Sequence, residues 1–335
     1  MSSSESIFYP ERNEYPALDA LWDKPVRELA QLHQPLFSPP EKERHALYSQ
    51  LVLALLAAFW NGNKHGPDGE YPWRERQRLS NGQGYEGGDY LGHNIACIAV
   101  DERGRVVDFD FNHNQIFDST VEHAESRLVR RIFSLVHLHD GWMWSEPSAA
   151  GPVRRSATNL SNITVYTSLE PCSQCAGIMT LGHVKEVVFL QPDQGQYSIA
   201  SILLNLARHH GTKYLPARPV PARAFGLDYF DKQRANYVNF ARTVAERPFF
   251  VSPDHQYTDR SSSIASFLCT DSARDAIATG AAPLLASAAL SFPDFHPTSS
   301  EHLSGVLSNQ EIAQHCLRFL DYAIRFGRRG TPHQL

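Results

Sequence analysis

The chain has 335 residues, of which 42% are hydrophobic and 20% charged, and its formal net charge is −5. This composition is typical of a soluble globular protein, and the length allows one large domain or two of ordinary size. The acidic balance excludes a protein whose whole surface attracts polyanions, while a local basic patch stays compatible with it.

Cysteine usage and the start of the chain predict a reduced, cytoplasmic protein. The five cysteines are an odd number in a long chain, which is unlike a secreted disulfide framework. Cys97, Cys269 and Cys316 are expected to be buried thiols. Residues 1–5 do not resemble a secretory signal, and the longest apolar run, 51–60, has about half the length of a bilayer span. We therefore expect no membrane partner.

The first part of the chain predicts an arm, a buried helix and a long insertion. Residues 1–40 lack periodicity and are expected to form an extended arm with one short helix near 17–32. The run Ser38-Pro39-Pro40-Glu41 resembles a helix start, and the following helix should extend over 40–60 with an apolar second half. Residues 61–92 are rich in Gly, Asn and Asp, which predicts a functional or mobile insertion.

The middle of the chain alternates between strand and helix patterns. A hairpin turn at 101–104 separates two expected strands, and a second insertion is expected at 138–162. The expected strands are 94–100, 106–111, 163–167, 185–190 and 213–220, and the expected helices are 120–137, 171–181 and 198–209. This alternation predicts a mixed α/β sheet with helices packed on it.

The last third of the chain has helical patterns at 228–247, 262–290 with breaks, and 309–326. The pattern is compatible with a separate helical module and equally with a cap on the sheet. The domain prediction is an arm over 1–40, a central α/β domain over 41–225 that contains both insertions, and a helical extension over 226–335.

Two short motifs supply metal ligands. His123-Ala124-Glu125 offers an imidazole, and Pro171-Cys172-Ser173-Gln174-Cys175 offers two thiols on one face of a helix start, where the helix dipole favours thiolates. The proline predicts that both thiols lie in the first helical turn. Three protein ligands leave the fourth position of a tetrahedral zinc ion open to water, as in catalytic sites. No second Cys-x-x-Cys motif accompanies them, which argues against a structural zinc knuckle.

Glu125 is the predicted proton carrier. A carboxylate beside zinc and its water can accept a proton and later deliver it to the substrate. Residues two apart on a helix do not face each other, so His123 and Glu125 can serve one metal only from the first turn. The alternative, a capping box that starts the helix at Ser119, would place both residues a turn further in.

These motifs resemble those of the zinc nucleobase deaminases. The segment 166–179, Tyr-Thr-Ser-Leu-Glu-Pro-Cys-Ser-Gln-Cys-Ala-Gly-Ile-Met, is similar to the second zinc motif of bacterial tRNA adenosine deaminases and guanine deaminases, and Lys185-Glu-Val-Val-Phe189 to the strand that follows it. The resemblance covers about residues 94–220. It implies the three-layer cytidine-deaminase-like fold, with a five-stranded mixed sheet between helices. The crossover at 191–213 points to the subgroup whose last two strands are parallel.

The resemblance also implies roles for individual residues. It makes His123, Cys172 and Cys175 zinc ligands and Glu125 the proton shuttle. Asn112 precedes His123 by eleven residues, as does the family asparagine that binds the target base, and the Ala124 N–H is expected to be a further donor to the base. The Asp-Pro-Thr-Ala run that precedes the histidine in the adenosine deaminases is absent here.

The implied activity is a zinc-dependent hydrolase that converts the exocyclic amine of a nucleobase to a carbonyl. Its first candidate substrate is adenosine in tRNA, and the alternative is a free purine, nucleoside or nucleotide. From another class, a non-catalytic zinc-containing subunit that binds nucleic acid would need no Glu125. The resemblance suggests a homodimer, and a lid over a small substrate is one interpretation of 61–92.

Basic residues give weaker signals. Trp142 and Trp144 are expected to fasten a long loop onto the core, with Arg154 and Arg155 solvated. The alternative is a loop whose tryptophans stack on an extruded base and whose arginines contact phosphates. Three arginines on the helix after His123, at 127, 130 and 131, fit a polyanion-facing surface and equally a solvated helix face.

Overall fold

The computed structural model describes residues 24–31, 35–60, 92–114, 119–138, 159–196, 198–210, 215–251, 254–256, 258–298 and 303–326. Its helices are α2 (Val26–Leu29), α3 (Pro39–Ala58), α4 (Ala124–Leu138), α5 (Ser173–Leu181), α6 (Ile199–His210), α7 (Asp228–Glu246), α8 (Ile264–Phe267), α9 (Asp271–Leu285) and α10 (Asn309–Phe326). Its strands are β1 (Ala96–Val100), β2 (Val106–Phe111), β3 (Thr164–Thr167), β4 (Glu186–Phe189), β5 (Arg218–Pro221), β6 (Phe250–Val251) and β7 (Thr258–Asp259).

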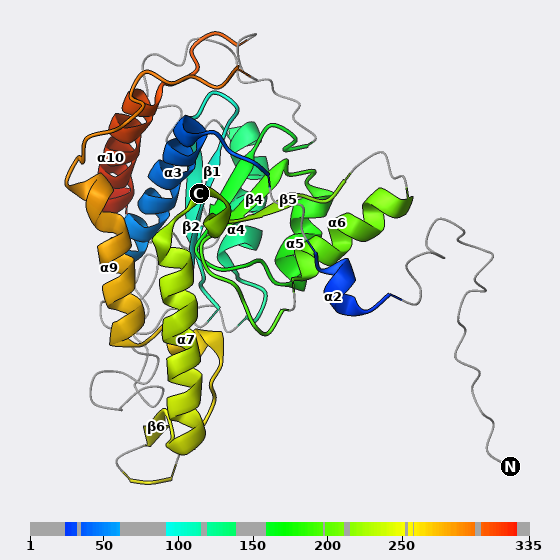
Figure 1. The fold of residues 1–335 in the computed structure, drawn as a ribbon, viewed down its shortest axis with the longest axis vertical. Coiled ribbons are helices and arrows are strands. Elements are labelled where there is room, and N and C mark those ends of the chain that lie inside the picture. Colours follow the sequence, from blue (N-terminus) through cyan, green and yellow to red (C-terminus); the bar gives the residue numbers. More distant parts are fainter. Residues whose placement is uncertain are drawn as a thin grey trace, which may run out of the picture.

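Strands β1 to β5 form one mixed sheet in the order β2-β1-β3-β4-β5 (Figure 1). β1 pairs antiparallel with β2 and β3, whereas β3, β4 and β5 are parallel. A parallel pair needs a crossover, which α5 and α6 provide. The five-stranded sheet and its parallel last strands confirm the predicted fold class.

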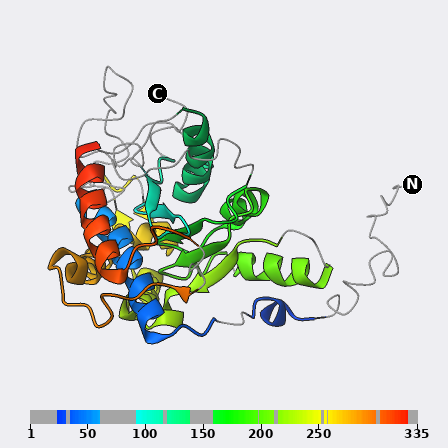
Figure 2. The same cartoon turned by 90° about the horizontal axis from the view of Figure 1, so that it is seen from above.

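Helices cover both faces of the sheet, which makes the predicted three layers (Figure 2). Side chains of α4 and α5 pack with Cys97, Ala99 and Val165 of the strands, while α3 packs with Ile98 and Tyr166 on the opposite face. The alternation along β1 and β3 sends successive side chains to opposite faces. Both faces are thus buried.

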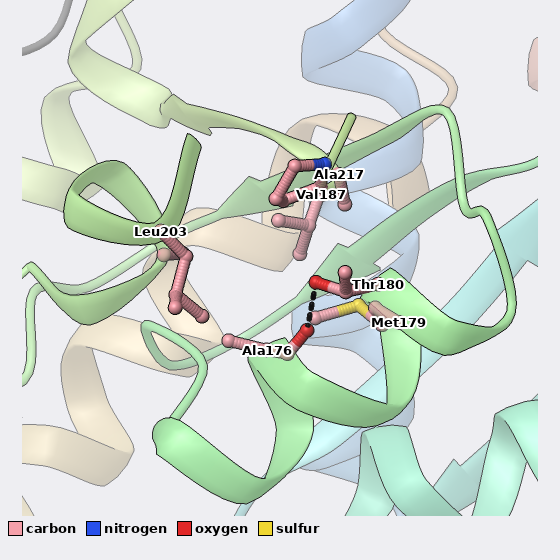
Figure 3. A pocket seen from close by; sticks show the side chains of 8 residues that line it. Ala176, Met179, Thr180, Val187, Leu203 and Ala217 are labelled. Atoms are coloured by element: carbon pink, nitrogen blue, oxygen red, sulfur yellow. Dashed lines mark hydrogen bonds between the residues drawn. The ribbon is translucent and has the colours of Figure 1, made fainter. Parts of the chain in front are cut away.

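α5 and α6 lie together over the parallel half of the sheet, where they border a small apolar hollow (Figure 3). The Thr180 hydroxyl in this hollow donates to the Ala176 carbonyl oxygen of its own helix at 2.8 Å. That polar group is therefore satisfied inside α5. The rest of the lining is mainly apolar and includes Met179, Val187 and Leu203.

α3 is the central helix of the other face, and it is almost wholly buried in its second half. Leu51, Val52, Leu53, Leu55 and Leu56 are fully buried. One side of α3 contacts the sheet, and α9 and α10 cover the rest (Figure 1). The C-terminal helices therefore share one hydrophobic core with the sheet, and the exact domain boundaries stay a prediction.

Two helix starts differ from the sequence expectation. The helix expected from 120 begins at Ala124, because backbone hydrogen bonds from Ser119 N–H to Asn114 O and from His113 N–H to Glu122 O tie the preceding segment to the end of β2. The helix expected from Pro171 begins at Ser173, so Cys172 is its N-cap residue and precedes the first turn.

Other expectations fall outside the described residues. The insertion 61–92 is described only at residue 92, and the tryptophans and arginines of 138–162 are not described. Of the N-terminal arm, residues 24–31 and 35–40 are described, and they contain the short helix α2. Among the helices in the described ranges, none has the length and apolar character that a bilayer crossing requires. Cys97, Cys269 and Cys316 are free and buried, as expected.

Candidate zinc centre

Two helix N-termini on one face of the sheet bring the predicted ligands together. His123 directly precedes α4, and Cys172 directly precedes α5, with Cys175 in the first turn of that helix. α4 and α5 contact each other. The positive ends of both helix dipoles therefore lie beside the thiols, which favours the thiolate form.

The three candidate ligand atoms have the spacing of a tetrahedral zinc site. His123 Nδ1 lies 3.3 Å from Cys172 Sγ and 3.6 Å from Cys175 Sγ, and the two sulfurs are 3.5 Å apart. Zinc–sulfur bonds of about 2.3 Å and zinc–nitrogen bonds of about 2.0 Å predict tetrahedral edges of about 3.5–3.8 Å. The donor set and the observed edges both fit zinc, and the described residues contain this one group with metal-ligand spacing.

The family comparison agrees with this geometry. Residues 79–191 match the family model described as the cytidine and deoxycytidylate deaminase zinc-binding region. This part of the chain is therefore similar to the zinc-binding region of those deaminases. The matched region contains both predicted zinc motifs and strands β1 to β4.

A curated relative matches part of the chain. It is named "probable cytosine deaminase", comes from Schizosaccharomyces pombe (strain 972 / ATCC 24843), and is 28% identical over 97 residues. The match covers 29% of this chain and 46% of the relative, so the chain spans about half of the relative's length.

Solved structures of deaminases also resemble the chain. One, from work on A-to-I editing by tRNA:A34 deaminases, is 17% identical with a TM-score of 0.27, and the match covers 38% of this chain and 82% of that one. The guanine deaminase of Bacillus subtilis gives 18% identity, a TM-score of 0.24 and coverage of 31% and 53%. The guanine deaminase of Nitrosomonas europaea gives 15% identity, a TM-score of 0.27 and coverage of 40% and 70%.

The two thiols of the centre contact each other, and their pKa values shift in opposite directions. The hydrogen bond between the thiols lowers the pKa of Cys172, and the hydrogen bond with His123 lowers it further. The same contact with Cys172, together with burial, raises the pKa of Cys175. The hydrogen bond with Cys172 also raises the pKa of His123. A divalent cation at this point would displace thiol protons, since metal ligands must be deprotonated.

Glu125 is fixed beside the centre. It is the second residue of α4, and its carboxyl lies 3.3 Å from Cys175 Sγ through Oε2. The Thr167 hydroxyl, at the end of β3, donates to Glu125 Oε1 at 2.8 Å. Burial raises the pKa of the Glu125 carboxyl, and the Thr167 hydrogen bond opposes that rise. Because α4 begins at Ala124, Glu125 lies in its first turn and His123 directly precedes the helix, so the alternative start at Ser119 is wrong.

Asn112 and Ala124 contact each other. The Ala124 N–H donates to Asn112 Oδ1 at 2.7 Å, which joins the residue after β2 to the first residue of α4. The Asn112 side chain is fully buried, and its Nδ2 has no hydrogen-bond partner within the described ranges. A buried amide donor without a partner is costly, so this atom is suited to a bound acceptor.

Three residues of the site were not identified from the sequence. Thr167 orients Glu125. The sequence carried a signal for it, because Thr167 is two residues after Val165 and so shares the face of β3 that α4 covers. Gln174 Nε2 donates to Val121 O and to Ser126 Oγ, both at 2.9 Å, which joins α5 to the start of α4. The position of Gln174 inside the cysteine motif was the available signal. The third residue is Arg127, which contacts Glu122 beside His123.

The arginines of α4 correct a sequence interpretation. Arg127 and Arg131 neither line a polyanion-facing surface nor lie on a solvated face, because both are buried against aspartates of β2. The alternation of acidic and apolar residues along 106–111 was the available signal, since it places Asp108 and Asp110 on one face of the strand. Arg130 is partly exposed and pairs with Glu122.

Proposed function

We propose that the protein is a zinc-dependent hydrolytic deaminase that replaces the exocyclic amine of a nucleobase by a carbonyl and releases ammonia. The observation that carries the proposal is the Glu125 carboxyl, which is buried and held at the edge of a three-ligand centre by Thr167. A zinc site that serves only folding does not require a buried carboxyl beside its ligands. The match of residues 79–191 to a deaminase zinc-binding region supports the same function.

Each residue of the centre has a proposed task. His123, Cys172 and Cys175 would hold zinc, which when bound lowers the pKa of a coordinated water towards neutrality. Glu125 would accept a proton from water and deliver it to a ring nitrogen of the base as the water oxygen adds to the carbon that carries the amine. It would then accept the proton of the new hydroxyl group and pass it to the departing amine, so that the carbonyl forms as ammonia leaves. The upward shift of the Glu125 pKa, caused by burial, suits a group that must both take and return a proton.

Asn112 is the proposed base-binding residue. Its Oδ1 is already engaged with the Ala124 N–H, so the group left for the substrate is the Nδ2 donor. A donor at this point would select an acceptor atom on the base. The predicted role of the Ala124 N–H as a donor to the base stays a prediction.

Two substrate classes are supported by different observations. Adenosine in tRNA is the first candidate, because the segment 166–179 resembles the second zinc motif of the tRNA adenosine deaminases. A free base or nucleoside is the second candidate, and the relative named as a probable cytosine deaminase supports it. A homodimer and a cytoplasmic location also remain predictions.

One assay series separates these candidates. The zinc-loaded full chain would be incubated with free bases, nucleosides, nucleotides and tRNA, and ammonia release and the mass change of the substrate would be measured. Turnover of an unmodified tRNA alone supports the first candidate, and turnover of a small compound supports the second. Zinc binding without any turnover would instead support a non-catalytic subunit that binds nucleic acid.

Glu125→Gln tests the proton shuttle. We expect turnover to fall by about 100-fold or more, because the amide cannot accept and return a proton, while zinc content stays unchanged. The matched control is Glu186→Gln, which alters another buried carboxyl that pairs with Arg218 at the start of β4. Full turnover in Glu125→Gln would refute the proposed role.

A further inference from the structure

Two parallel ion pairs join α4 to β2 inside the protein. Arg127 Nε lies 3.0 Å from Asp110 Oδ1, and Arg131 Nε lies 2.9 Å from Asp108 Oδ2. The arginines are one helical turn apart, and the aspartates alternate on one face of the strand. Displacing one partner of a buried ion pair leaves an uncompensated buried charge, which is costly. Both ion pairs therefore hold α4 and β2 in a defined relative position.

Arg127 differs from Arg131 by a second carboxylate partner. Its Nη1 lies 2.6 Å from Glu122 Oε2, and Glu122 directly precedes the zinc ligand His123. The backbone oxygen of Glu122 accepts the His113 N–H at 2.9 Å. The guanidinium therefore bridges the end of β2 and the segment that leads into the metal centre.

This bridge spans the two parts of the proposed active site. Asp110 lies two residues before Asn112, and Arg127 lies two residues after Glu125. Apart from the bridge, the same two segments are joined by the Asn112–Ala124 hydrogen bond of 2.7 Å and the His113–Glu122 backbone hydrogen bond of 2.9 Å. A charge-assisted contact to two carboxylates is stronger and more directional than either neutral hydrogen bond. Arg127 is thus placed to fix the distance between the base-binding amide and the proton-carrying carboxyl.

We propose that Arg127 is a positioning residue that holds α4 in register with β2, so that His123 and Glu125 face the same substrate as Asn112. The kinetic part of this inference rests on the proposed deaminase function. The part that concerns the metal site does not, because the position of His123 sets zinc affinity whether or not a base is turned over.

Arg131 provides the matched comparison within the same helix. Its ion pair has the same chemistry and similar burial, but it lies one turn further from His123. A purely structural role for Arg127 would make Arg127→Met and Arg131→Met alike in every property. A positioning role separates them in zinc affinity and in kinetics.

The experiment compares the full-length variants Arg127→Met, Arg127→Lys and Arg131→Met. Zinc affinity would be measured by competition with a chelator, unfolding by denaturant titration, and kcat and KM on whichever base is turned over. We expect Arg127→Met to weaken zinc affinity and to lower kcat/KM, each by about 10- to 100-fold, which is typical of losing a residue that orients a metal ligand. Arg127→Lys should recover part of both losses, since it keeps the charge but cannot bridge two carboxylates.

Arg131→Met should lower the unfolding midpoint while zinc affinity and kcat/KM stay close to those of the unaltered protein. Equal losses of zinc affinity in Arg127→Met and Arg131→Met would overturn the inference. If Arg127→Met does not fold, Asp110→Asn is measured in its place, because it weakens the same pair with little change of shape. If the unaltered protein turns over no base, the proposed function fails, and the zinc affinities alone still decide the role of Arg127.

Discussion

Asn112 uses its two polar side-chain atoms differently. Oδ1 accepts the Ala124 N–H, whereas Nδ2 is buried without a hydrogen-bond partner among the described residues. A protein rarely leaves a buried donor unsatisfied unless a ligand or water completes it. The position next to His123 and Glu125 makes a bound base the simplest partner for this atom.

Asn112→Asp separates the two atoms, because it keeps an acceptor for the Ala124 N–H and removes the amide donor. We expect kcat/KM to fall about tenfold or more, which corresponds to the loss of one buried hydrogen bond to the substrate. Zinc content should not change. Asn205→Asp is the control, since the Asn205 amide donates to Leu29 O and Gln31 O instead. Unchanged kinetics in Asn112→Asp would remove Asn112 from the substrate site.

At this scale the sequence predicted the ligand cluster but not the groups around it. His123, Cys172 and Cys175 have a spacing that few other sites require, and the structure brings them together. Thr167 and Arg127 have no such motif. Their contacts depend on which strand faces which helix, and that arrangement is a property of the folded chain.

Helix α9 makes a close contact with α3 at Gly280. A Cβ atom at this position would lie 2.5 Å from Leu53 Cδ1 and 3.2 Å from Tyr229 Cδ2. Leu53 is fully buried and cannot move aside without disturbing its neighbours. Glycine in the middle of a helix costs about 1 kcal/mol relative to alanine, so its presence here reflects the close approach of the helices.

Gly280→Ala is therefore expected to destabilise the protein by about 1–3 kcal/mol through overpacking, despite the better helix propensity of alanine. Gly177→Ala is the matched control in α5, because nothing lies within 4 Å of the added Cβ. It should stabilise the protein by up to about 1 kcal/mol. Denaturant unfolding of both variants measures the difference, and a stabilising Gly280→Ala would contradict the close contact.

Elements with strong periodicity were predicted almost to the residue, whereas helix starts were not. The helix expected over 309–326 and the strand expected over 106–111 match α10 and β2. α4 begins four residues later than expected, since backbone contacts with residues near the end of β2 hold the chain before Ala124 out of the helix. Such contacts join segments that local sequence patterns treat separately.

Buried histidines link the stability of the whole molecule to pH. His315 in α10 accepts the Val106 N–H through Nε2 at 2.9 Å, which joins the C-terminal helix to β2. Burial, together with the nearby charges of Arg318 and Arg105, lowers the pKa of His315 to about 4. In the unfolded chain this imidazole should have its ordinary pKa of about 6.5.

The unfolded state therefore binds more protons than the folded state between these two values, and stability should fall as the pH drops below about 6.5. The contribution of His315 to this loss between pH 7 and pH 5 is about 2 kcal/mol. His315→Gln keeps an acceptor for Val106 and does not titrate, so its stability should fall less over that range. Denaturant titrations of both proteins at pH 7 and pH 5 measure the difference. An equal loss of unfolding free energy in the variant and the unaltered protein would show that His315 does not contribute.

The position of the C-terminal third could not be predicted. Helical patterns at 228–247, 262–290 and 309–326 suit a separate bundle as well as a cap, because both bury one apolar side of each helix. The structure decides the matter through α3, whose apolar circumference is wide enough to contact the sheet on one side and α9 and α10 on the other. The local sequence pattern of α3 does not predict which elements pack against it.

The shared use of α3 has a practical consequence for anyone who wishes to shorten the chain. A fragment cut to residues 79–191 would keep both zinc motifs but lose α3, and with it the cover of Ile98, Tyr166 and Val188. An uncovered apolar sheet surface of this kind promotes self-association. Trimming after residue 225 would strip α9 and α10 from the other side of the same helix. The flanking segments thus shield the apolar sheet surface of the region that carries both zinc motifs, and expression trials should retain them.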